Sequence, residues 1–205
     1  MNQSQSLPTR ASLLERVQSG PNHPDWDELL RYYEPFIRQF LGKIGVAPKD
    51  VDDICQQVLA RLWKELSNYR RESEHARFRT WLSRLIRNVA INDYRKQKRA
   101  DNLNEIASEQ AESLLEKPSE LELLIEQEWQ QHVIGLALER LGQIFSGNAL
   151  EVFLRSSEGE STEQISEALG ISMQSVYVLK NRVKKRLTHE VKCVRQELEF
   201  PENES

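Results

Sequence analysis

The sequence is poor in cysteine and histidine, and it has no long hydrophobic run. Cys55 and Cys193 are the only cysteines, and neither belongs to a CxxC pair, so we expect no disulfide framework and no zinc site. The four histidines lack the spacing of metal ligands. No stretch of about 18 apolar residues is present, so no membrane span is expected. The N-terminus also lacks the pattern of a secretion signal. These absences favour a cytoplasmic protein without a metal or other cofactor.

Catalytic chemistry is also missing. Nothing in the sequence resembles a nucleophile–base pair, a glycine loop that cradles phosphate, or a set of metal ligands. We therefore expect no catalytic residues and no enzymatic activity. The length of 205 residues, with 39% hydrophobic content, suits one large domain or two small ones.

The charges are unevenly distributed along the chain, which has a net charge of −4. Residues 70–99 contain ten cations and three acids, and residues 174–195 contain seven cations and one acid. Between these basic blocks, residues 101–128 contain nine acids and one cation. The net charge argues against nucleic acid, but this distribution favours two DNA-contacting modules on a tether.

Residues 161–187 have the pattern of a helix-turn-helix. Ser161 and Gln164 predict a capping box, Gly170 permits a sharp reversal, and Ser172 can cap a second helix with an apolar stripe. The candidate DNA contacts on the other faces of this second helix are Gln174, Ser175, Tyr177, Lys180, Asn181, Arg182, Lys184 and Lys185. Such a helix can lie in a major groove, with amides and hydroxyls near base edges and cations on phosphates. A plain helical hairpin with a solvated basic face is the alternative.

Residues 25–99 are predicted to form a helical module. Two short helices are expected at 25–33 and 35–44, with Pro35 in the first turn of the second. The clearest helix spans residues 50–66, where apolar residues recur at three-to-four-residue spacing. Its other face carries acids and amides: Asp50, Asp52, Asp53, Gln56 and Gln57. Acids at a helix start favour the helix dipole, and such a face also suits a basic protein partner, so the residues alone leave both interpretations open. Cys55 in this helix is interpreted as a core residue, with a redox role as the alternative.

A predicted loop at 67–77 leads into a helix at 78–97 with a strong apolar side. The candidate contacts to a nucleic-acid strand are Arg79, Trp81, Arg84, Arg87, Asn88, Arg95 and Lys96. Cations attract phosphates, and aromatics and amides can hold an unpaired base. The helical spacing of Trp81 favours a place in the core over a base platform.

The remaining segments complete an all-α protein of two small domains, 25–99 and 119–198. The acidic, polar residues 100–118 predict a flexible linker. Ser119 and Glu122 predict a capping box that opens a helix to about Leu141, whose apolar residues, Trp129 among them, start the second core. Residues 1–24 and 199–205 are expected to be flexible, with a regulatory role as the alternative.

Two of these segments resemble a known family. DVDDICQQVLARLW (50–63) and FRTWLSRLIRNVAINDYRKQKR (78–99) resemble region 2 of bacterial sigma factors of the sigma-70 family, and the helix-turn-helix at 161–187 resembles their region 4. The order of the modules and their short connection resemble the small extracytoplasmic-function (ECF) group. The resemblance covers roughly residues 25–99 and 133–190, without room for the middle domain of larger sigma factors.

The resemblance implies a sigma factor that binds core RNA polymerase and directs promoter-specific initiation. The acid-and-amide face at 50–57 would bind the β′ clamp helices, and the β flap and an anti-sigma factor are further expected partners. The 67–77 loop and the helix after it would recognise and melt the minus-ten element, with one base leaving the stack. The helix-turn-helix would bind the minus-thirty-five element. The acidic linker would either mimic RNA in polymerase channels or be an ordinary solvated tether.

Two departures from the family pattern concern specificity. The 67–77 loop is slightly longer than usual, and Tyr177 and Lys180 replace the residue types expected in the recognition helix. The alternative function is a free-standing dimeric helix-turn-helix regulator that binds operator DNA. That reading explains residues 161–187 but gives no role to the acidic helix face or the first basic block.

Overall fold

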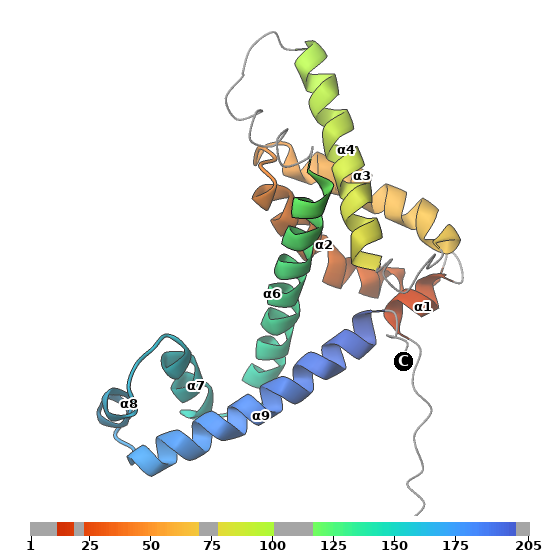
Figure 1. Ribbon diagram of the computed structural model, residues 1–205. Helices are drawn as coiled ribbons and strands as arrows, with labels where there is room; N and C mark the ends of the chain where they lie inside the picture. The colour runs from red at the N-terminus through yellow and green to blue at the C-terminus, as the bar shows by residue number, and fades with distance from the viewer. Residues whose placement is uncertain (1–11, 19–22, 70–77, 101–116, 200–205) are drawn as a thin grey trace, which may run out of the picture. The chain divides into compact units, whose positions relative to one another are not determined.

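The computed structural model describes residues 12–18, 23–69, 78–100 and 117–199. Every regular element in these residues is a helix, which confirms the all-α class. The elements are α1 (Leu13–Gln18), α2 (Trp26–Lys43), α3 (Val51–Glu65), the 3-10 turn η1 (Leu66–Asn68), α4 (Phe78–Ala100), α6 (Pro118–Ile144), α7 (Ala149–Ser157), α8 (Thr162–Leu169) and α9 (Met173–Leu198) (Figure 1). No helix among the described residues is long and apolar enough to cross a membrane.

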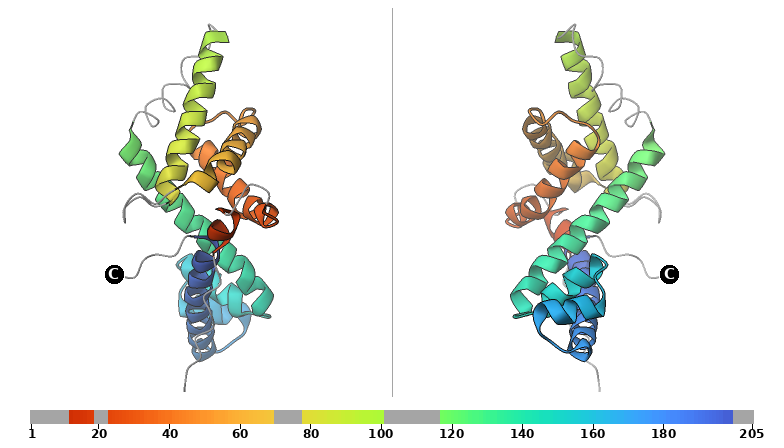
Figure 2. Two further views of the ribbon diagram at one scale, coloured as in Figure 1. Left: turned by 90° about the vertical axis from the view of Figure 1, so that its right-hand side faces the viewer. Right: turned by 90° about the vertical axis from the view of Figure 1, so that its left-hand side faces the viewer.

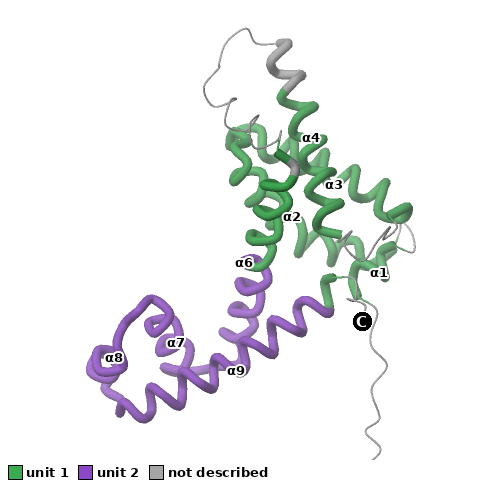
Figure 3. Tube along the Cα trace, in the orientation of Figure 1, with its two compact units in different colours: residues 1–130, 197–205 green, residues 131–196 purple. Residues whose placement is uncertain are grey.

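The chain divides into two compact units (Figure 3). Unit 1 comprises residues 1–130 and 197–205, and unit 2 comprises residues 131–196. Within unit 1, α3 packs against both α2 and α4 (Figure 2). Its core is built from the apolar sides of these amphipathic helices, including the buried residues Leu29, Phe40, Ile54, Leu62, Leu82 and Ile86.

The start of α6 belongs to unit 1 because of an aromatic cluster. Trp129 stacks on Tyr33 with ring centroids 5.0 Å apart, and Phe36 meets Trp129 edge-on at 4.9 Å. The expectation that Trp129 starts the second core was wrong. Helical periodicity shows that Trp129 has a buried side, but it does not show which domain covers that side. The unit boundary accordingly follows Gln130, whereas the charge and capping pattern predicts a domain boundary before Ser119.

The region expected to hold two short helices is the single helix α2, with Pro35 inside it. Proline cannot donate a backbone hydrogen bond to the carbonyl of Arg31, four residues earlier. Both Pro35 and Arg31 are exposed, so water can satisfy this carbonyl. The proline is therefore tolerated on the solvent side of a continuous helix.

The N-terminal segment was expected to be flexible, and for residues 12–18 this was wrong. These residues include α1, with Leu13, Leu14 and Val17 buried. Arg16 forms ion pairs with Asp25 and, at 3.3 Å, with Glu28. A six-residue helix is too short for periodicity to reveal it. Of the other residues expected to be flexible, 1–11 and 19–22 lie outside the described residues, and 23–24 directly precede Asp25 and α2.

Helix α6 begins at Pro118, so Ser119 lies inside the helix and is not its N-cap, contrary to the expected capping box. Proline is favoured at the first helical position because its missing N–H would have no partner there. Lys117 also pairs with Glu120 at 3.1 Å. Of the predicted flexible linker at 100–118, residues 101–116 lie outside the described residues, while Ala100 ends α4 and Pro118 begins α6.

Unit 2 has a small core formed by α6 to α9. Val152, Ile165 and Val176 form one buried cluster, which joins α7 to the helix-turn-helix. A second cluster contains Leu141, Ala149 and Val183 and joins α6 to α9. The apolar stripe of α9 is thus buried against α6, α7 and α8, and residues on its other faces, such as Lys180 and Lys184, are exposed to solvent.

Replacing Trp129 with alanine should destabilise unit 1, because it removes a fully buried indole from the aromatic cluster. The free energy of unfolding should fall by about 3–5 kcal/mol. The neighbouring exposed change Gln130→Ala should alter it by less than about 0.5 kcal/mol. Denaturant unfolding followed by circular dichroism measures both values, and equal effects would show that the indole does not hold the unit together.

Candidate functional site

The first candidate surface lies on α3, whose opposite side packs into unit 1. Ile54, Val58 and Leu62 are buried. The predicted polymerase-binding residues Asp52, Asp53, Gln56 and Gln57 are exposed together on the other side, and Asp50 is half-buried just before the helix. The structure thus brings the five predicted residues to one end of one helix.

One carboxylate of this surface is already paired. Arg38 of α2 forms ion pairs with Asp52 and, at 2.8 Å, with Glu34. Hydrogen bonds to Glu34 and Asp52 raise the pKa of the Arg38 guanidinium. Asp53 makes no ion pair with any described residue. Asp53, Gln56 and Gln57 therefore present the most available polar groups of the surface.

Cys55 lies on the buried side of α3, as the core interpretation predicted. Burial raises the pKa of its thiol to about 11. The thiolate is the reactive form of cysteine, so Cys55 is protonated and unreactive near neutral pH.

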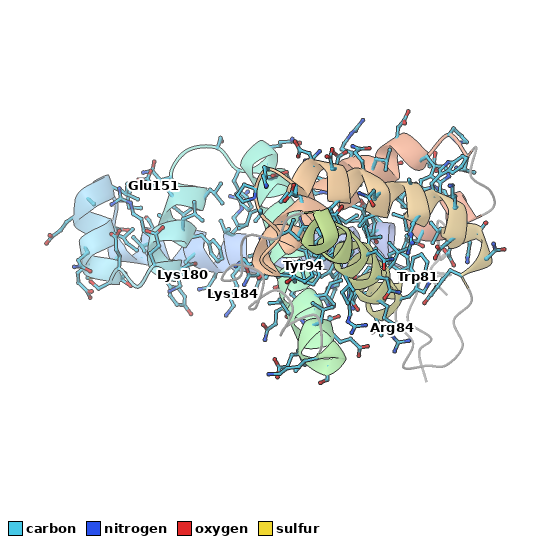
Figure 4. The ribbon with its side chains drawn as sticks, turned by 90° about the horizontal axis from the view of Figure 1, so that it is seen from above. Trp81, Arg84, Tyr94, Glu151, Lys180 and Lys184 are labelled. Atoms are coloured by element: carbon cyan, nitrogen blue, oxygen red, sulfur yellow. The ribbon has the colours of Figure 1, made fainter. Side chains whose placement is uncertain are left out.

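The second candidate surface lies on α4. Leu82, Leu85, Ile86 and Val89 are buried, as their spacing predicted. Arg84 and Asn88 are exposed and Arg87 is half-buried. Arg84 extends from the outer side of α4 (Figure 4) and lies 3.4 Å from a carboxylate oxygen of Glu122. The side chains of Arg95 and Lys96, and the loop residues 70–77, lie outside the described residues.

Trp81 belongs to an aromatic cluster at the start of α4. Its ring lies 5.2 Å from that of Tyr69 and 5.5 Å from that of Phe78, measured between centroids. Tyr69 and Phe78 are buried, whereas Trp81 is half-buried. Trp81 therefore packs against the core, as its spacing favoured, but part of its ring is exposed to solvent.

Arg79 does not lie on an exposed polar face, and that expectation was wrong. It is 8% exposed. Its Nε lies 2.6 Å from Glu126 and its Nη1 lies 3.0 Å from Glu199. Burial lowers the pKa of the Arg79 guanidinium, but the two carboxylates raise it by more. The arginine is held as a cation by residues far away in the sequence, which helical periodicity cannot reveal.

The same place anchors the C-terminal end of α9, where the tail was expected to be flexible from residue 199. Glu199 also accepts a 2.6 Å hydrogen bond from the indole N–H of Trp129. The hydroxyl of Tyr33 donates to the carbonyl of Leu198 at 3.1 Å. Burial raises the pKa of Tyr33 well above its usual value, so the hydroxyl stays protonated and able to donate. The expectation was wrong for Glu199, and residues 200–205 lie outside the described residues.

The predicted helix-turn-helix is present in unit 2 as α8, the turn at Gly170, and α9. Ser161 and Gln164 form the expected capping box, with the Ser161 N–H donating to Gln164 Oε1 at 2.8 Å. Gly170 has φ of 63°, in the left-handed region that glycine favours. Ser172 Oγ accepts from the N–H of Ser175 at 3.1 Å, which is the expected second cap.

The recognition helix leaves most of its candidate contacts exposed. Exposed are Gln174, Tyr177, Lys180, Arg182, Lys184 and Lys185, and half-buried are Ser175 and Asn181. Lys180 and Lys184 project from the same side of α9 (Figure 4). The Arg182 guanidinium lies 5.4 Å from the centroid of the Phe145 ring, a cation–π contact that restrains its direction. The arrangement offers a rigid cationic helix face.

No group of three or more potential metal ligands occurs among the described residues. The three surfaces on α3, α4 and α9 instead present carboxylates and amides on α3, and cations on α4 and α9. The exposed apolar residues Met173 and Val178 of α9 were missed by the sequence analysis. Their position on the recognition helix was the only available signal.

Residues 29–100, which lie within unit 1, match the Sigma-70 region 2 family. No curated protein matches the chain. Among solved structures, the chain is similar to CnrH in its complex with the cytosolic domain of CnrY, at 19% identity. That likeness covers 88% of this chain and 96% of the other, with a TM-score of 0.32. A TM-score this low does not establish a shared overall arrangement.

Replacing Arg79 with alanine should leave two carboxylates without their cation in a largely buried place. Removing one partner of a buried ion pair typically costs about 3–5 kcal/mol of unfolding free energy. The matched change Arg84→Ala removes an exposed arginine of the same helix and should cost less than about 1 kcal/mol. Chemical denaturation of the three proteins measures the difference. Equal stabilities for the two variants would contradict a structural role for Arg79.

Proposed function

We propose that this chain is a sigma factor of the ECF type, which binds core RNA polymerase and directs it to specific promoters. One observation carries the proposal: a Sigma-70 region 2 domain and a helix-turn-helix with a cationic recognition helix occur in the same chain. A dimeric operator-binding regulator would need only the second of these. It would have no use for a region 2 domain.

The α3 surface is the proposed contact with the β′ clamp helices. Its carboxylate and amide groups are exposed on one side of a helix that is fixed by its buried side. Complementary charge speeds encounter and sets the register of two proteins more than it adds affinity. Gln56 and Gln57 lie beyond the first turn of α3 and gain nothing from the helix dipole, which supports a partner-binding role for this face over helix stabilisation alone.

The α4 surface is the proposed contact with the minus-ten element. Arg84, Arg87 and Asn88 lie on the polar side of α4, where cations can hold phosphates of the melted strand. Base extrusion costs a few kcal/mol, which contacts to the strand and to a base pocket must offset. Arg95 and Lys96 extend the proposed surface by their sequence position. Arg79 is not part of it, because its cation is buried and paired.

Unit 2 is proposed to bind the minus-thirty-five element and to contact the β flap. In helix-turn-helix proteins the second helix enters the major groove and the first crosses the backbone. The exposed Lys180, Lys184 and Lys185 can hold phosphates, while Gln174 and Tyr177 lie in the first turns, near base edges. Sequence would then be read at the start of α9, and affinity would come from its cationic middle.

Reversing charge on α3 with the double variant Asp53→Lys/Gln56→Lys should weaken binding to purified core RNA polymerase by tenfold or more. A tenfold loss corresponds to about 1.4 kcal/mol, within the range for like charges placed against a basic partner. Fluorescence anisotropy of the labelled full-length chain titrated with core enzyme measures this loss.

The control variant Asp27→Lys/Gln127→Lys adds the same charge to exposed positions of unit 1 away from α3. It should bind core polymerase as the unchanged chain does. Normal binding by the Asp53→Lys/Gln56→Lys variant would show that the α3 surface is not the polymerase contact. Absence of binding by the unchanged chain would refute the sigma-factor proposal itself.

Lys184→Ala should weaken DNA binding by a similar factor for all sequences, because a phosphate contact carries no sequence information. The slope of log affinity against log salt should become shallower by about one. Lys64→Ala removes an equal charge from α3 and should leave this slope unchanged. Affinities of the full-length chain, bound to core polymerase, for promoter DNA across a salt series provide the measurement. A change confined to one DNA sequence would place Lys184 on a base.

A further inference from the structure

The first two turns of α9 expose three large apolar side chains. Met173 is 53% exposed, Tyr177 is 68% exposed and Val178 is 55% exposed. None of the three belongs to the buried clusters of unit 2, which use Val176 and Val183 from this helix. Single exposed apolar residues need no explanation, but these three lie within six residues and together give the start of α9 an apolar surface.

The polar groups nearby are largely engaged within the protein. The Oγ of Ser175 lies 2.8 Å from that of Ser172, and its N–H is held by the same cap. The side-chain amide of Asn181 donates to the backbone carbonyl of Tyr177 at 3.0 Å. Both residues are half-buried, which disfavours them as base readers. The exposed polar groups left to read a base edge in these turns are the amide of Gln174 and the hydroxyl of Tyr177.

The charge around the apolar surface indicates which kind of molecule binds there. Lys180, Lys184 and Lys185 follow it on α9 and are exposed, so the flanking surface is cationic. A protein partner could cover apolar side chains, but a set of exposed cations that follows the start of the second helix of a helix-turn-helix complements the phosphates of duplex DNA. The occupant that fits is the floor of a major groove.

We propose that Met173, Tyr177 and Val178 read the C5 methyl groups of thymines in the minus-thirty-five element. This inference rests on the proposed function and deepens it. Thymine is the only base that presents a methyl group in the major groove, and apolar side chains recognise it by contact. The element should therefore contain thymines, on either strand, at the positions that face the start of α9.

The test begins with selection of bound duplexes from a randomised DNA library by the full-length chain in complex with core polymerase. Each selected thymine is then replaced by deoxyuridine, which pairs identically and lacks only the methyl group. Burial of one methyl-sized group is worth about 0.8 kcal/mol, which corresponds to about a fourfold change in affinity. We expect about this loss at one or more thymines and none at thymines outside the element.

Alanine variants assign the effect to individual side chains. In Val178→Ala and Met173→Ala, the affected thymine should no longer be distinguished from deoxyuridine. Alanine favours a helix, and both positions are exposed, so folding should be unaffected. The matched control Leu154→Ala truncates another exposed apolar residue of unit 2, 42% exposed on α7, and should keep full sensitivity to the methyl group.

The failures of this inference and of the proposed function are distinct. If the complex binds a selected element but deoxyuridine has no effect at any thymine, or the element has no thymine, the methyl-reading inference is wrong. If Met173→Ala and Val178→Ala weaken core polymerase binding and leave methyl sensitivity unchanged, the apolar surface serves a protein partner and the inference is equally overturned. If the chain binds no core polymerase at all, the proposed function fails first.

Discussion

A buried cation has to be paired, and in unit 1 this requirement links segments that are far apart in the sequence. The guanidinium of Arg79 in α4 is held by Glu126 from α6 and by Glu199 from the C-terminal end of the chain. An isolated charge in such a place would cost several kcal/mol, which the two carboxylates together offset. Trp129 and Tyr33 hydrogen-bond to the same C-terminal segment and stack on each other. The core of unit 1 is therefore closed by polar contacts as well as by apolar packing.

Each helix packs into a core by one side only, so its opposite side can carry a functional surface. Helix α3 is fixed by Ile54, Val58 and Leu62, so its acid-and-amide side is presented without a contribution to the core. Helix α4 likewise buries one side and leaves Arg84 and Asn88 exposed. In unit 2, the buried Val176 and Val183 hold α9 by one stripe. Each proposed contact thus stands on a helix whose position is set by its opposite side, a rigid arrangement that favours specific recognition.

Local features of the fold were predictable from the sequence because their causes are local. The extent of α3, the capping box of Ser161 and the turn at Gly170 follow from spacing and backbone chemistry within a few residues. The burial of Arg79 was not predictable, because its partners lie dozens of residues away. The same holds for Trp129, whose periodicity fitted either domain.

The candidate surfaces were likewise predictable from the sequence only in part. The exposure of Asp52, Asp53, Gln56 and Gln57 on α3 and of the cations of α9 follows from amphipathic spacing, which separates a buried side from a solvated one. Spacing does not show which hydrogen bonds a side chain makes. The hydrogen bond from the Asn181 amide to the Tyr177 carbonyl and the exposure of Val178 were therefore found only in the structure. The continuous α2 through Pro35 is a further case, since its tolerance depends on which side of the helix faces water.

The most direct measurement of the central claim is run-off transcription with purified bacterial core polymerase on genomic fragments from the host of this protein, with and without the full-length chain. A sigma factor should produce discrete new start sites that depend on the added chain, preceded by shared minus-ten and minus-thirty-five sequences. Operator binding by the chain alone, with no new transcripts and no association with core polymerase, would contradict it and identify a free-standing helix-turn-helix regulator.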